Sequence, residues 1–587
     1  MEKTCTQCQS SFEVTQEDLD FLGRVSPIFN EKKYSIPTPT LCVDCRHQDR
    51  QAWRNERVLY KRKCSATGKP IISVYSEDKP FPVYENDYWH SDKWDALSYG
   101  RDFDFTRPFF EQFKELTNIV PQIARSALSN ENSDYVNQAG WCRNCYLIFE
   151  ADHNENCLYS SYIYDSKFCM DMTMASKCQL CYESIDCENC YNLKFSQNCK
   201  NSSDSWFLKN CIGCKNCYGC VNLRNKEYFF LNEKLDKESY EKKVAAFKKM
   251  SIKSLKQAHA SFLNFAKKFP QKFMEGHQNE DVSGNYISSS KNCHDCYDIN
   301  NCWDCKNVTN SRFMKNCHDI TVFGSLEGAE VCYYCHEIGA GTKNVIFSDQ
   351  IISCYNINYS KACLSNSHDL FGCIGLKHKS YCILNKQYSE KEYNELVPKI
   401  IAHMEKNERA HGASAQVERE SGSASSSETE PKIENGEFGE FFPKELTPYS
   451  YNETVAQDYY PLSKEDAIKK GYTWRDPAKR DYLPQTYVVP EYIDEVKPDI
   501  TAQILACEIC KKNYKITEEE LNFYKKQLLP IPNDCHDCRH KNRFNLRNQR
   551  HLYKRNCQKC NIGIETTFKE DSDIVVYCEK CYMEVTE

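Results

Sequence analysis

Cysteines spaced by multiples of three residues constrain the fold of this chain more than any other feature. Between Cys142 and Cys220 they stand at 142, 145, 157, 169, 178, 181, 187, 190, 199, 211, 214, 217 and 220. An inward residue at every third position fits neither an α-helix, with 3.6 residues per turn, nor a flat strand, with a period of two. It is typical of a repeat coil whose short sides each contribute one inward side chain.

Four such triplets make one coil, because several of the cysteines also recur every twelve residues, as at 145, 157, 169 and 181. Asparagines recur at the same interval, at 132, 144 and 156. We therefore predict a mainly β protein with a narrow β-solenoid of 12-residue coils over 126–232. A lumen of this width admits only small side chains, and cysteine is a small, soft hydrophobe, which explains its abundance without chemistry.

A second cysteine-rich solenoid is predicted over 281–385, where Cys293, Cys305 and Cys317 step by twelve. Its phase slips before Cys354 and again before Cys373, which indicates bulges or short loops. Both solenoids end in similar sequences, and a helical segment follows each: a connector over 233–280 and a capping helix over 386–408. The second helix opens with the capping box Ser389-x-x-Glu392. We expect these helices to cover exposed sheet edges.

The other segments differ in composition. Residues 65–125 are rich in aromatic side chains and are interpreted as an α/β adaptor. Residues 409–436 are Ser-rich and acidic, which is typical of a disordered linker. Residues 437–500 hold many Tyr and Pro, and we expect an extended segment that packs on another part of the chain.

Twelve cysteines form paired Cys-x-x-Cys knuckles at the two ends, which indicates zinc. Four thiolates close a tetrahedral site with no position open to water, so three structural zinc ions are expected. The predicted ligand sets are Cys5, Cys8, Cys42 and Cys45; Cys507, Cys510, Cys535 and Cys538; and Cys557, Cys560, Cys578 and Cys581.

The N-terminal module (1–64) and the C-terminal double module (501–587) are copies of each other. Cys42-Val-Asp-Cys-Arg-His matches Cys535-His-Asp-Cys-Arg-His, and the residue numbers differ by 493. The N-terminal copy has Cys64, Thr67, Glu85 and Tyr88 where the other copy has its last four ligands, so we predict no second zinc there and a buried Cys64. A knuckle followed by a helix that carries two ligands is similar to a treble-clef finger.

Basic residues follow the second knuckle in both copies, over 46–63 and 539–555, and we expect both stretches to be helical. Arginines at helical spacing form one stripe, and guanidinium forks suit phosphate oxygens. Contact with RNA, DNA or a ribonucleoprotein is one interpretation; an acidic protein partner and a solvated charged face are the alternatives. The candidate residues are Arg46, Arg50, Arg54, Arg57, Arg539, Arg543, Arg547, Arg550 and Lys554.

The solenoid cysteines could also hold a metal, because Cys211, Cys214, Cys217 and Cys220 occupy four successive sides of one coil. Zinc or an iron–sulfur cluster is the less favoured reading, and plain buried thiols are the favoured one. Cys-His-Asp at 293–295 and 317–319 does not predict catalysis, since thiol and imidazole should point to opposite sides of the coil wall. No phosphate loop, dinucleotide fingerprint or hydrolase signature is present.

Charge and hydropathy limit the partners and the cell compartment that we expect for this chain. The formal net charge is −7, so any nucleic-acid contact must be local. The sequence opens without an apolar signal core and contains no apolar run near ~18 residues, so a cytoplasmic protein without membrane contact is expected. No small-molecule substrate is indicated.

The arrangement as a whole resembles a family of cysteine-rich zinc-ribbon (treble-clef) and β-solenoid proteins that recurs in candidate-phyla bacteria. The resembling stretches are Arg54-Asn-Glu-Arg, Tyr99-Gly-Arg-Asp-Phe-Asp-Phe-Thr-Arg-Pro-Phe-Phe, Cys211-Ile-Gly-Cys-Lys-Asn-Cys and Gly471-Tyr-Thr-Trp-Arg-Asp-Pro. The resemblance covers nearly the whole chain and implies no established chemistry. Some members carry a CoA-transferase label, which no residue of this sequence supports.

The sequence therefore favours a non-enzymatic zinc protein. In the leading hypothesis, the terminal modules contact nucleic acid or a ribonucleoprotein while the solenoids act as a rigid spacer. The first alternative is a protein–protein interaction scaffold that uses the solenoid walls, and the second is a thiol- or metal-handling protein.

Overall fold

The structure is a computed structural model that describes all residues except 248, 325–326, 407–435, 477–481 and 587. The chain forms two compact units. Unit 1 comprises Met1–Ala124, Met274–Asp476 and Arg550–Leu552, and unit 2 comprises Arg125–Phe273, Pro477–Gln549 and Tyr553–Glu587. No helix in the described residues has both the length and the apolar character needed to cross a bilayer.

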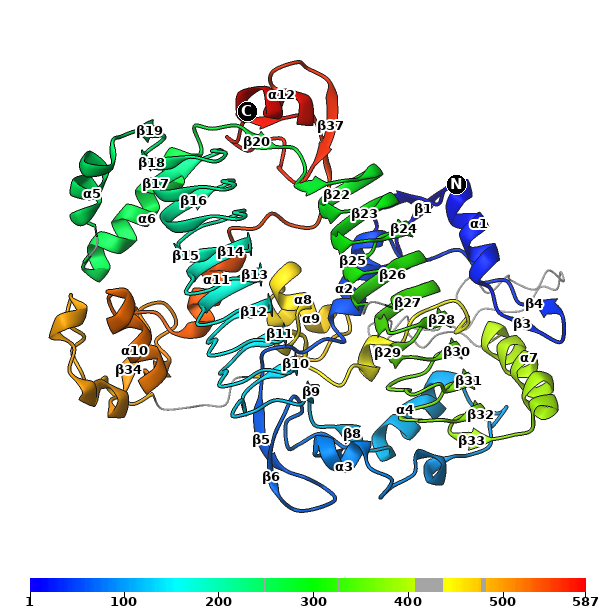
Figure 1. Ribbon diagram of the computed structural model, residues 1–587. Coiled ribbons are helices and arrows are strands. Elements are labelled where there is room, and N and C mark those ends of the chain that lie inside the picture. The colour runs from blue at the N-terminus through cyan, green and yellow to red at the C-terminus, as the bar shows by residue number, and fades with distance from the viewer. Residues whose placement is uncertain (248, 325–326, 407–435, 477–481, 587) are drawn as a thin grey trace, which may run out of the picture. The chain divides into compact units, whose positions relative to one another are not determined.

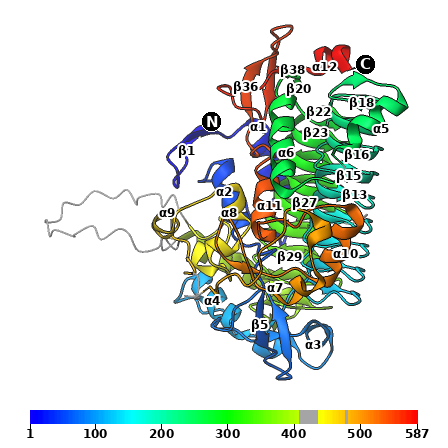
Figure 2. The same ribbon diagram turned by 90° about the vertical axis from the view of Figure 1, so that its left-hand side faces the viewer.

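Unit 2 contains an 11-stranded coiled sheet whose strands follow one another in chain order and stack as rungs (Figures 1 and 2). All neighbours are parallel except the last pair. The strands are β9 (Ala127–Leu128), β10 (Asn137–Gly140), β11 (Phe149–Asp152), β12 (Ser161–Tyr164), β13 (Met170–Ser176), β14 (Tyr182–Glu188), β15 (Tyr191–Lys194), β16 (Ser203–Lys209), β17 (Lys215–Val221), β18 (Glu227–Phe230) and β19 (Glu233–Lys234).

The register of this sheet confirms the predicted coil length. Ala139 pairs with Ala151, Ala151 with Ile163, Ile163 with Ala175 and Ala175 with Cys187, each twelve residues along the chain. The cysteines at every third position are all buried in one cluster with these residues. A mainly β fold with a β-solenoid arrangement and a few short helices is therefore confirmed.

The corners of the coils explain the asparagines. Almost every third residue has a positive φ, for example 48° at Asn132, 54° at Asn144 and 54° at Asn156. Asparagine tolerates this left-handed conformation better than most residues. Stacked amides add a ladder along the corner, since Asn132 Nδ2 donates to Asn144 Oδ1 over 2.9 Å and Asn144 Nδ2 to Asn156 Oδ1 over 3.3 Å.

Unit 1 contains a 13-stranded coiled sheet with the same construction. Cys293 pairs with Cys305 and Cys305 with Cys317 at steps of twelve, but Cys317 pairs with Cys332 at a step of fifteen. The strands are β21 (Gly276–His277), β22 (Glu280–Ser288), β23 (Lys291–Asn300), β24 (Trp303–Lys306), β25 (Thr309–Arg312), β26 (Met314–Phe323), β27 (Ala329–Gly339), β28 (Thr342–Ile346), β29 (Asp349–Ile352), β30 (Tyr355–Asn358), β31 (His368–Phe371), β32 (Ser380–Ile383) and β33 (Lys386–Gln387).

An asparagine side chain closes the last coil of each sheet. The amide of Asn232 accepts from the N–H of Val221 over 2.8 Å and donates to its carbonyl over 2.9 Å. Asn385 makes the same pair of bonds with Ile374, over 2.7 and 2.8 Å. The amide thus replaces the next strand and satisfies edge backbone groups that would otherwise remain unpaired.

Helices follow both sheets. In unit 2, α5 (Lys237–Ala245) and α6 (Ile252–Ala266) bury Tyr240 and Phe262 in one cluster with Phe207 and Tyr218 of the sheet. In unit 1, α7 (Glu390–Lys406) packs on β32 and opens with the Ser389–Glu392 capping box. The linker predicted at 409–436 lies outside the described residues except for its last position.

The remaining elements surround the coiled sheets. Unit 1 also holds β1 (Glu2–Thr4), β2 (Ser11–Glu13), α1 (Gln16–Val25), β3 (Ile28–Phe29), β4 (Lys32–Lys33), α2 (Val43–Gln51), β5 (Tyr60–Lys63), β6 (Pro70–Ser73), β7 (Val83–Tyr84), α3 (Asn86–His90), η1 (Ala96–Tyr99), α4 (Phe109–Ile119), β8 (Gln122–Ile123), η2 (Lys444–Leu446), η3 (Tyr451–Glu453), α8 (Ala456–Tyr459) and α9 (Lys464–Lys469). Unit 2 also holds β20 (Gln271–Lys272), η4 (Ile493–Glu495), η5 (Pro498–Ala502), β34 (Leu505–Ala506), β35 (Asn513–Tyr514), α10 (Glu518–Gln527), α11 (His536–Phe544), β36 (Tyr553–Asn556), β37 (Gly563–Thr566), β38 (Val576–Tyr577) and α12 (Glu579–Thr586).

Candidate metal centres

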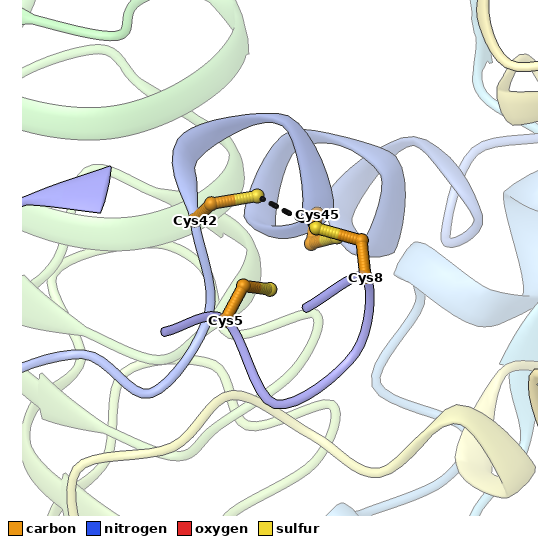
Figure 3. Close-up of side chains that lie close together, drawn as sticks. All are labelled: Cys5, Cys8, Cys42 and Cys45. Atoms are coloured by element: carbon orange, nitrogen blue, oxygen red, sulfur yellow. Dashed lines mark hydrogen bonds between the residues drawn. The ribbon is translucent and has the colours of Figure 1, made fainter. Parts of the chain in front are cut away.

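Three groups of four cysteines come together at the ends of the chain. Within each group the sulfur atoms all lie within 4.8 Å of one another, and the groups are the three ligand sets predicted from the knuckles: Cys5, Cys8, Cys42 and Cys45; Cys507, Cys510, Cys535 and Cys538; and Cys557, Cys560, Cys578 and Cys581. Figure 3 shows the first group, in which the four sulfurs point toward one another and Cys8 Sγ lies 3.6 Å from Cys42 Sγ. Each group could hold a metal ion.

A tight turn positions the first two ligands of each group. In the N-terminal group, the N–H of Cys5 donates to Ser10 O over 2.9 Å and the N–H of Gln9 donates to Cys5 O over 2.9 Å. Gln9 has a φ of 64°, which closes the turn, and Lys511 and Asn561 take the same conformation in the other two groups. The turn brings both sulfurs of a Cys-x-x-Cys pair to the same side.

The start of a helix supplies the other two ligands. Cys42 is the N-cap of α2 and Cys45 lies in its first turn, while Cys535 and Cys538 hold the same places in α11. The neighbouring Cys45 thiol is the main cause that lowers the Cys42 pKa, to about 5, and Cys8 and Cys5 add to it, although burial acts against this. Burial raises the pKa of Cys507 and of Cys557, but neighbouring backbone N–H groups outweigh it and bring these pKa values to about 7 and about 6. Such thiolates are ready metal ligands.

The donor sets fit a structural zinc ion best. Four thiolates in one closed tetrahedral group are the usual ligands of structural zinc, and they leave no position for water or substrate. Zinc would hold the knuckle against the helix start in each module. The expected chemistry is therefore structural and not hydrolytic.

The region around Cys64 keeps the backbone of a zinc module without its ligands. The N–H of Cys64 donates to Lys69 O over 2.8 Å and the Cys64 sulfur accepts from the N–H of Glu85 over 3.3 Å. At the equivalent place, Cys557 N–H donates to Ile562 O over 2.8 Å and Cys557 Sγ accepts from Cys578 N–H over 3.3 Å. Cys64 is buried, and Thr67, Glu85 and Tyr88 replace the other three thiols.

The basic helices are shorter than predicted. The expectation that 46–63 and 539–555 are helical throughout is wrong, because α2 ends at Gln51 and α11 at Phe544. The chain turns after each helix to form the hairpins β5–β6 and β36–β37, whose connecting turns carry Cys64 and Cys557. Arg54, Arg57, Arg547, Arg550 and Lys554 therefore lie beyond the helices.

In unit 1, the arginines of α2 face the coiled sheet. Arg46 Nη2 lies 3.0 Å from Asp319 Oδ2, and Arg50 Nη1 lies 3.1 Å from Asp319 Oδ1. Arg50 Nε also donates to Thr321 Oγ1 over 3.0 Å. All three charged side chains are almost wholly buried, with 7%, 0% and 2% exposed. Burial opposes the ionisation of Asp319, but the two guanidinium groups hold its pKa below the usual range.

In unit 2, α11 repeats this arrangement. Arg539 Nε lies 2.9 Å from Asp171 Oδ2, and Arg543 Nη1 lies 2.9 Å from Asp171 Oδ1. Arg543 Nε donates to Thr173 Oγ1 over 3.4 Å. We call the two arginines, their shared aspartate and its threonine neighbour the arginine clamp of each unit.

The next arginine along the chain extends each clamp. Arg54 Nη1 lies 3.7 Å from Glu337 Oε2, and Arg54 Nε lies 2.6 Å from Glu56 Oε1. In the other unit, Arg547 Nε lies 3.2 Å from Asp186 Oδ1. Glu337 and Asp186 stand at matching corners of the two sheets, one coil and one further corner beyond the clamp aspartates. The two modules are therefore copies of each other both in sequence and in the way they contact the coiled sheets.

Sequence reasoning missed the clamp, although a signal was present. Both aspartates lie in the motif Cys-x-Asp-x-Thr, at Cys169-Met-Asp-Met-Thr and Cys317-His-Asp-Ile-Thr. In this motif the cysteine points into the lumen and the aspartate occupies a left-handed corner, with φ of 56° at Asp171 and 57° at Asp319.

Segment 437–476 covers the other side of α2. The hydroxyl of Tyr451 accepts from Gln48 over 2.7 Å, Tyr472 OH bonds to Asp49, and Tyr460 OH lies 2.8 Å from His47 Nδ1. Every residue of α2 from Cys45 to Gln51 is buried as a result. The tyrosines of this segment thus pack on α2, and the segment is not extended throughout, since it contains η2, η3, α8 and α9.

The other basic candidates lie apart from the clamps. Arg550 Nη2 lies 2.8 Å from Asp298 Oδ2 in unit 1, and its guanidinium group stands 4.3 Å from the ring centre of Tyr459. Arg57 is half-buried beyond α2. Lys554 is exposed on β36.

The cysteines of the coils have a structural task that the sequence did not reveal. Each of the 24 sulfurs between Cys142 and Cys382 donates to the carbonyl two residues before it, as Cys157 does to Glu155 O over 3.5 Å. The bonds span 3.1 Å at Cys335 to 3.6 Å at Cys214. Cys211, Cys214, Cys217 and Cys220 make these bonds as well, and among the described residues they do not form one of the groups whose sulfurs all lie within 4.8 Å.

The Cys-His-Asp sequences place thiol and imidazole on different sides of the coil wall, as expected. Cys317 is buried in the lumen, where it donates to Lys315 O over 3.3 Å. His318 lies outside the coil and stacks on Phe21 of α1, with ring centres 3.6 Å apart.

Comparison with known proteins adds no assignment. No family model matches the chain, and no curated protein matches it. Among solved structures, the chain is similar to a crystal structure from Desulfovibrio desulfuricans G20 whose description names an acetyltransferase, with 10% identity over 37% of this chain. The match spans 62% of that chain, which is less than two thirds of its length, and the TM-score of 0.10 carries no argument.

Proposed function

We propose that this protein is a non-enzymatic interaction scaffold in which three zinc ions hold the terminal modules and the coiled sheets present the binding surface. The observation that carries this proposal is the burial of the arginine clamps. Arg50 and Arg543 are 0% and 2% exposed, and each shares a buried aspartate with a second arginine. Guanidinium groups engaged in this way support a structural role in place of contact with phosphate.

The exposed wall of each coiled sheet is the surface left for a partner. In unit 2 it is centred on one residue per coil, Arg143, Glu155, Lys167, Gln179, Tyr191, Ser203, Lys215 and Glu227, all exposed or half-buried. Charges of opposite sign neighbour each other along it, since Glu155 pairs with both Arg143 and Lys167. A wall whose charges are balanced in this way attracts nucleic acid weakly.

Aromatic side chains on these walls favour a protein partner. Trp141 and Tyr191 in unit 2 are 51% and 43% exposed, and Trp303 and Tyr355 in unit 1 are 41% and 43% exposed. Exposed Trp and Tyr rings are enriched at the centres of protein–protein interfaces.

Photo-crosslinking from the wall tests this proposal. A photoreactive phenylalanine analogue replaces Tyr191 or Tyr355 in the full chain, and Val488, which is 88% exposed and lies outside the walls, serves as the control position. The proposal predicts the same discrete, nuclease-resistant protein adduct from both wall positions in extracts of the source cells, and none from Val488. Adducts that disappear with nuclease, or no adduct from either wall, would contradict it.

A further inference from the structure

The thiols in the lumen of unit 2 form one connected set. Cys145, Cys157, Cys169 and Cys181 occupy the same inward position in successive coils, because the residues that follow them pair in register, and neighbouring coils are spaced by ~4.8 Å. Cys142 adjoins Cys145, and Cys178 adjoins Cys181. The set continues from Cys178 through Cys190 and Cys187 to Cys199, and all these side chains are at most 2% exposed.

Hydrogen bonding does not explain why these residues are cysteines. Ser160 and Ser184 occupy the same inward positions in other triplets and donate to the carbonyl two residues before them, over 2.9 and 3.0 Å. Their oxygens also accept from a backbone N–H of the next coil, as Ser160 Oγ does from Met172 N–H over 3.0 Å. Serine thus satisfies the same backbone carbonyl and, in addition, a backbone N–H of the next coil. A thiol adds only lower polarity and the capacity to bind soft metal ions.

The arrangement of the sulfurs fits an ion with two ligands. Among the described residues, only the three terminal groups bring four sulfurs within 4.8 Å of one another, which is what tetrahedral zinc requires. The luminal sulfurs instead meet in neighbouring pairs along a line. Monovalent copper is the soft ion that cysteine sulfur selects, and two sulfur ligands suffice to hold it.

Charge balance also favours a monovalent ion in this apolar space. Each Cu⁺ that enters bonds to one thiol sulfur and displaces its proton to solvent, and the sulfur of the next thiol supplies the second bond. The lumen therefore gains no net charge, which avoids the large cost of burying an isolated ion. Copper enters and leaves in the +1 state, so no electron is transferred.

We propose that the luminal cysteines of the coiled sheets are a binding site for monovalent copper, separate from the three terminal zinc sites. The main set is Cys142 to Cys199 in unit 2, and the ring of Cys211, Cys214, Cys217 and Cys220 and the stacked Cys293, Cys305 and Cys317 of unit 1 are smaller sets of the same kind. This site is independent of any partner on the exposed walls.

Anaerobic titration of the zinc-loaded full chain with Cu⁺, in competition with a chromophoric Cu⁺ chelator, tests the proposal. We expect the chain to take up copper while it keeps its zinc. Replacing Cys145, Cys157, Cys169 and Cys181 with serine should remove about two copper ions, since each ion needs a pair of thiols and these four form two pairs. Cys64→Ser, which removes a buried thiol outside the lumen, should leave the copper capacity unchanged.

Two results would overturn the proposal. One is copper uptake that only displaces an equivalent amount of zinc from the terminal groups. The other is a fourfold serine variant that folds and takes up as much copper as the wild type. If that variant does not fold, the variant C293S/C305S/C317S in unit 1 is titrated in its place. Copper uptake equal to that of the wild type would again overturn the proposal.

Discussion

Arg543 Nη1 lies 2.9 Å from Asp171 Oδ1, and the two side chains are 2% and 0% exposed. Arg50 and Asp319 repeat this contact in the other unit over 3.1 Å. The ion pairs join a module that could hold metal to a coiled sheet whose sequence lies hundreds of residues away. The stripes of arginine are thus part of the internal packing of both units.

Removal of a clamp aspartate should destabilise the unit that contains it. Asp171→Asn removes the carboxylate that two buried guanidinium groups share, although Arg543 keeps Glu183 and Arg539 keeps Glu520. We therefore expect a loss of about 3 kcal/mol, the low end for a broken buried pair. Urea unfolding followed by a probe in each unit should show a lower midpoint for unit 2 in D171N and for unit 1 in D319N. Arg107→Gln removes two exposed pairs, with Glu111 and with Glu115, and should cost at most ~1 kcal/mol. Equal effects of D171N and R107Q would contradict the clamp.

Luminal cysteines should tolerate serine better than alanine. Cys157→Ser keeps a donor for Glu155 O and adds an acceptor for the backbone of the next coil, so we expect a loss below about 1 kcal/mol. Cys157→Ala removes this donor and opens a small cavity, while Glu155 O keeps its bond from the N–H of Phe168 over 2.9 Å, so we expect a loss of about 1–2 kcal/mol. Urea midpoints of the full chain compare the two. A serine variant as unstable as the alanine variant would show that packing alone places cysteine there.

The metal content should be three zinc ions per chain, because the fourth module has lost its ligands. Its backbone remains that of the others, so T67C/E85C/Y88C should rebuild a Cys₄ group with Cys64 and raise the zinc content to four. Elemental analysis of the purified chain gives both values. The single variant T67C has only two thiols at this place, Cys64 and the new one, so its zinc content should stay at three. Four zinc ions in the wild type, or three in a folded triple variant, would be inconsistent with this account.

The stability of unit 1 should fall in mild acid because of His318. Burial against Phe21 lowers the His318 pKa to about 4, while the nearby carboxylates of Asp319 and Asp18 act against the shift and Lys306 and Arg46 add to it. An unfolded histidine, with a pKa near ~6.5, binds a proton that the folded one does not. The contribution of His318 is therefore complete above that pKa and is lost as the pH falls toward 4, by about 2 kcal/mol at pH 5.

His318→Phe keeps the stacked ring but cannot take up a proton. Urea midpoints at pH 7.5 and pH 5 should differ less in this variant than in the wild type, with zinc content checked at both values. An identical pH dependence in the two proteins would show that His318 does not cause the loss.

The sequence predicted those parts of the structure that depend on local spacing. The coil length followed from cysteines that recur every twelve residues, and the metal groups followed from Cys-x-x-Cys pairs, because a tight turn fixes two ligands within four residues. The left-handed corners could be predicted from the sequence only where asparagines stack. Tyr, Phe and Lys, which do not favour this conformation, occupy other corners of the same kind.

The role of the arginines could not be read in the same way. Helical spacing shows that Arg46 and Arg50 share one face, but it does not show what that face contacts. Asp319 looks like any polar corner residue of a repeat, and its pairing with α2 depends on contacts across more than 250 residues of chain. Only the repeated Cys-x-Asp-x-Thr motif, once in each solenoid, pointed to a shared role.

Amide hydrogen exchange of α2 and α11 tests the central claim most directly, because it reports on the docking of each module separately. The account predicts that α2 loses protection in D319N and α11 in D171N, while each variant keeps its zinc and the other helix stays protected. Full protection of both helices in both variants, with zinc retained, would contradict the claim that the buried arginines hold the modules on the coiled sheets.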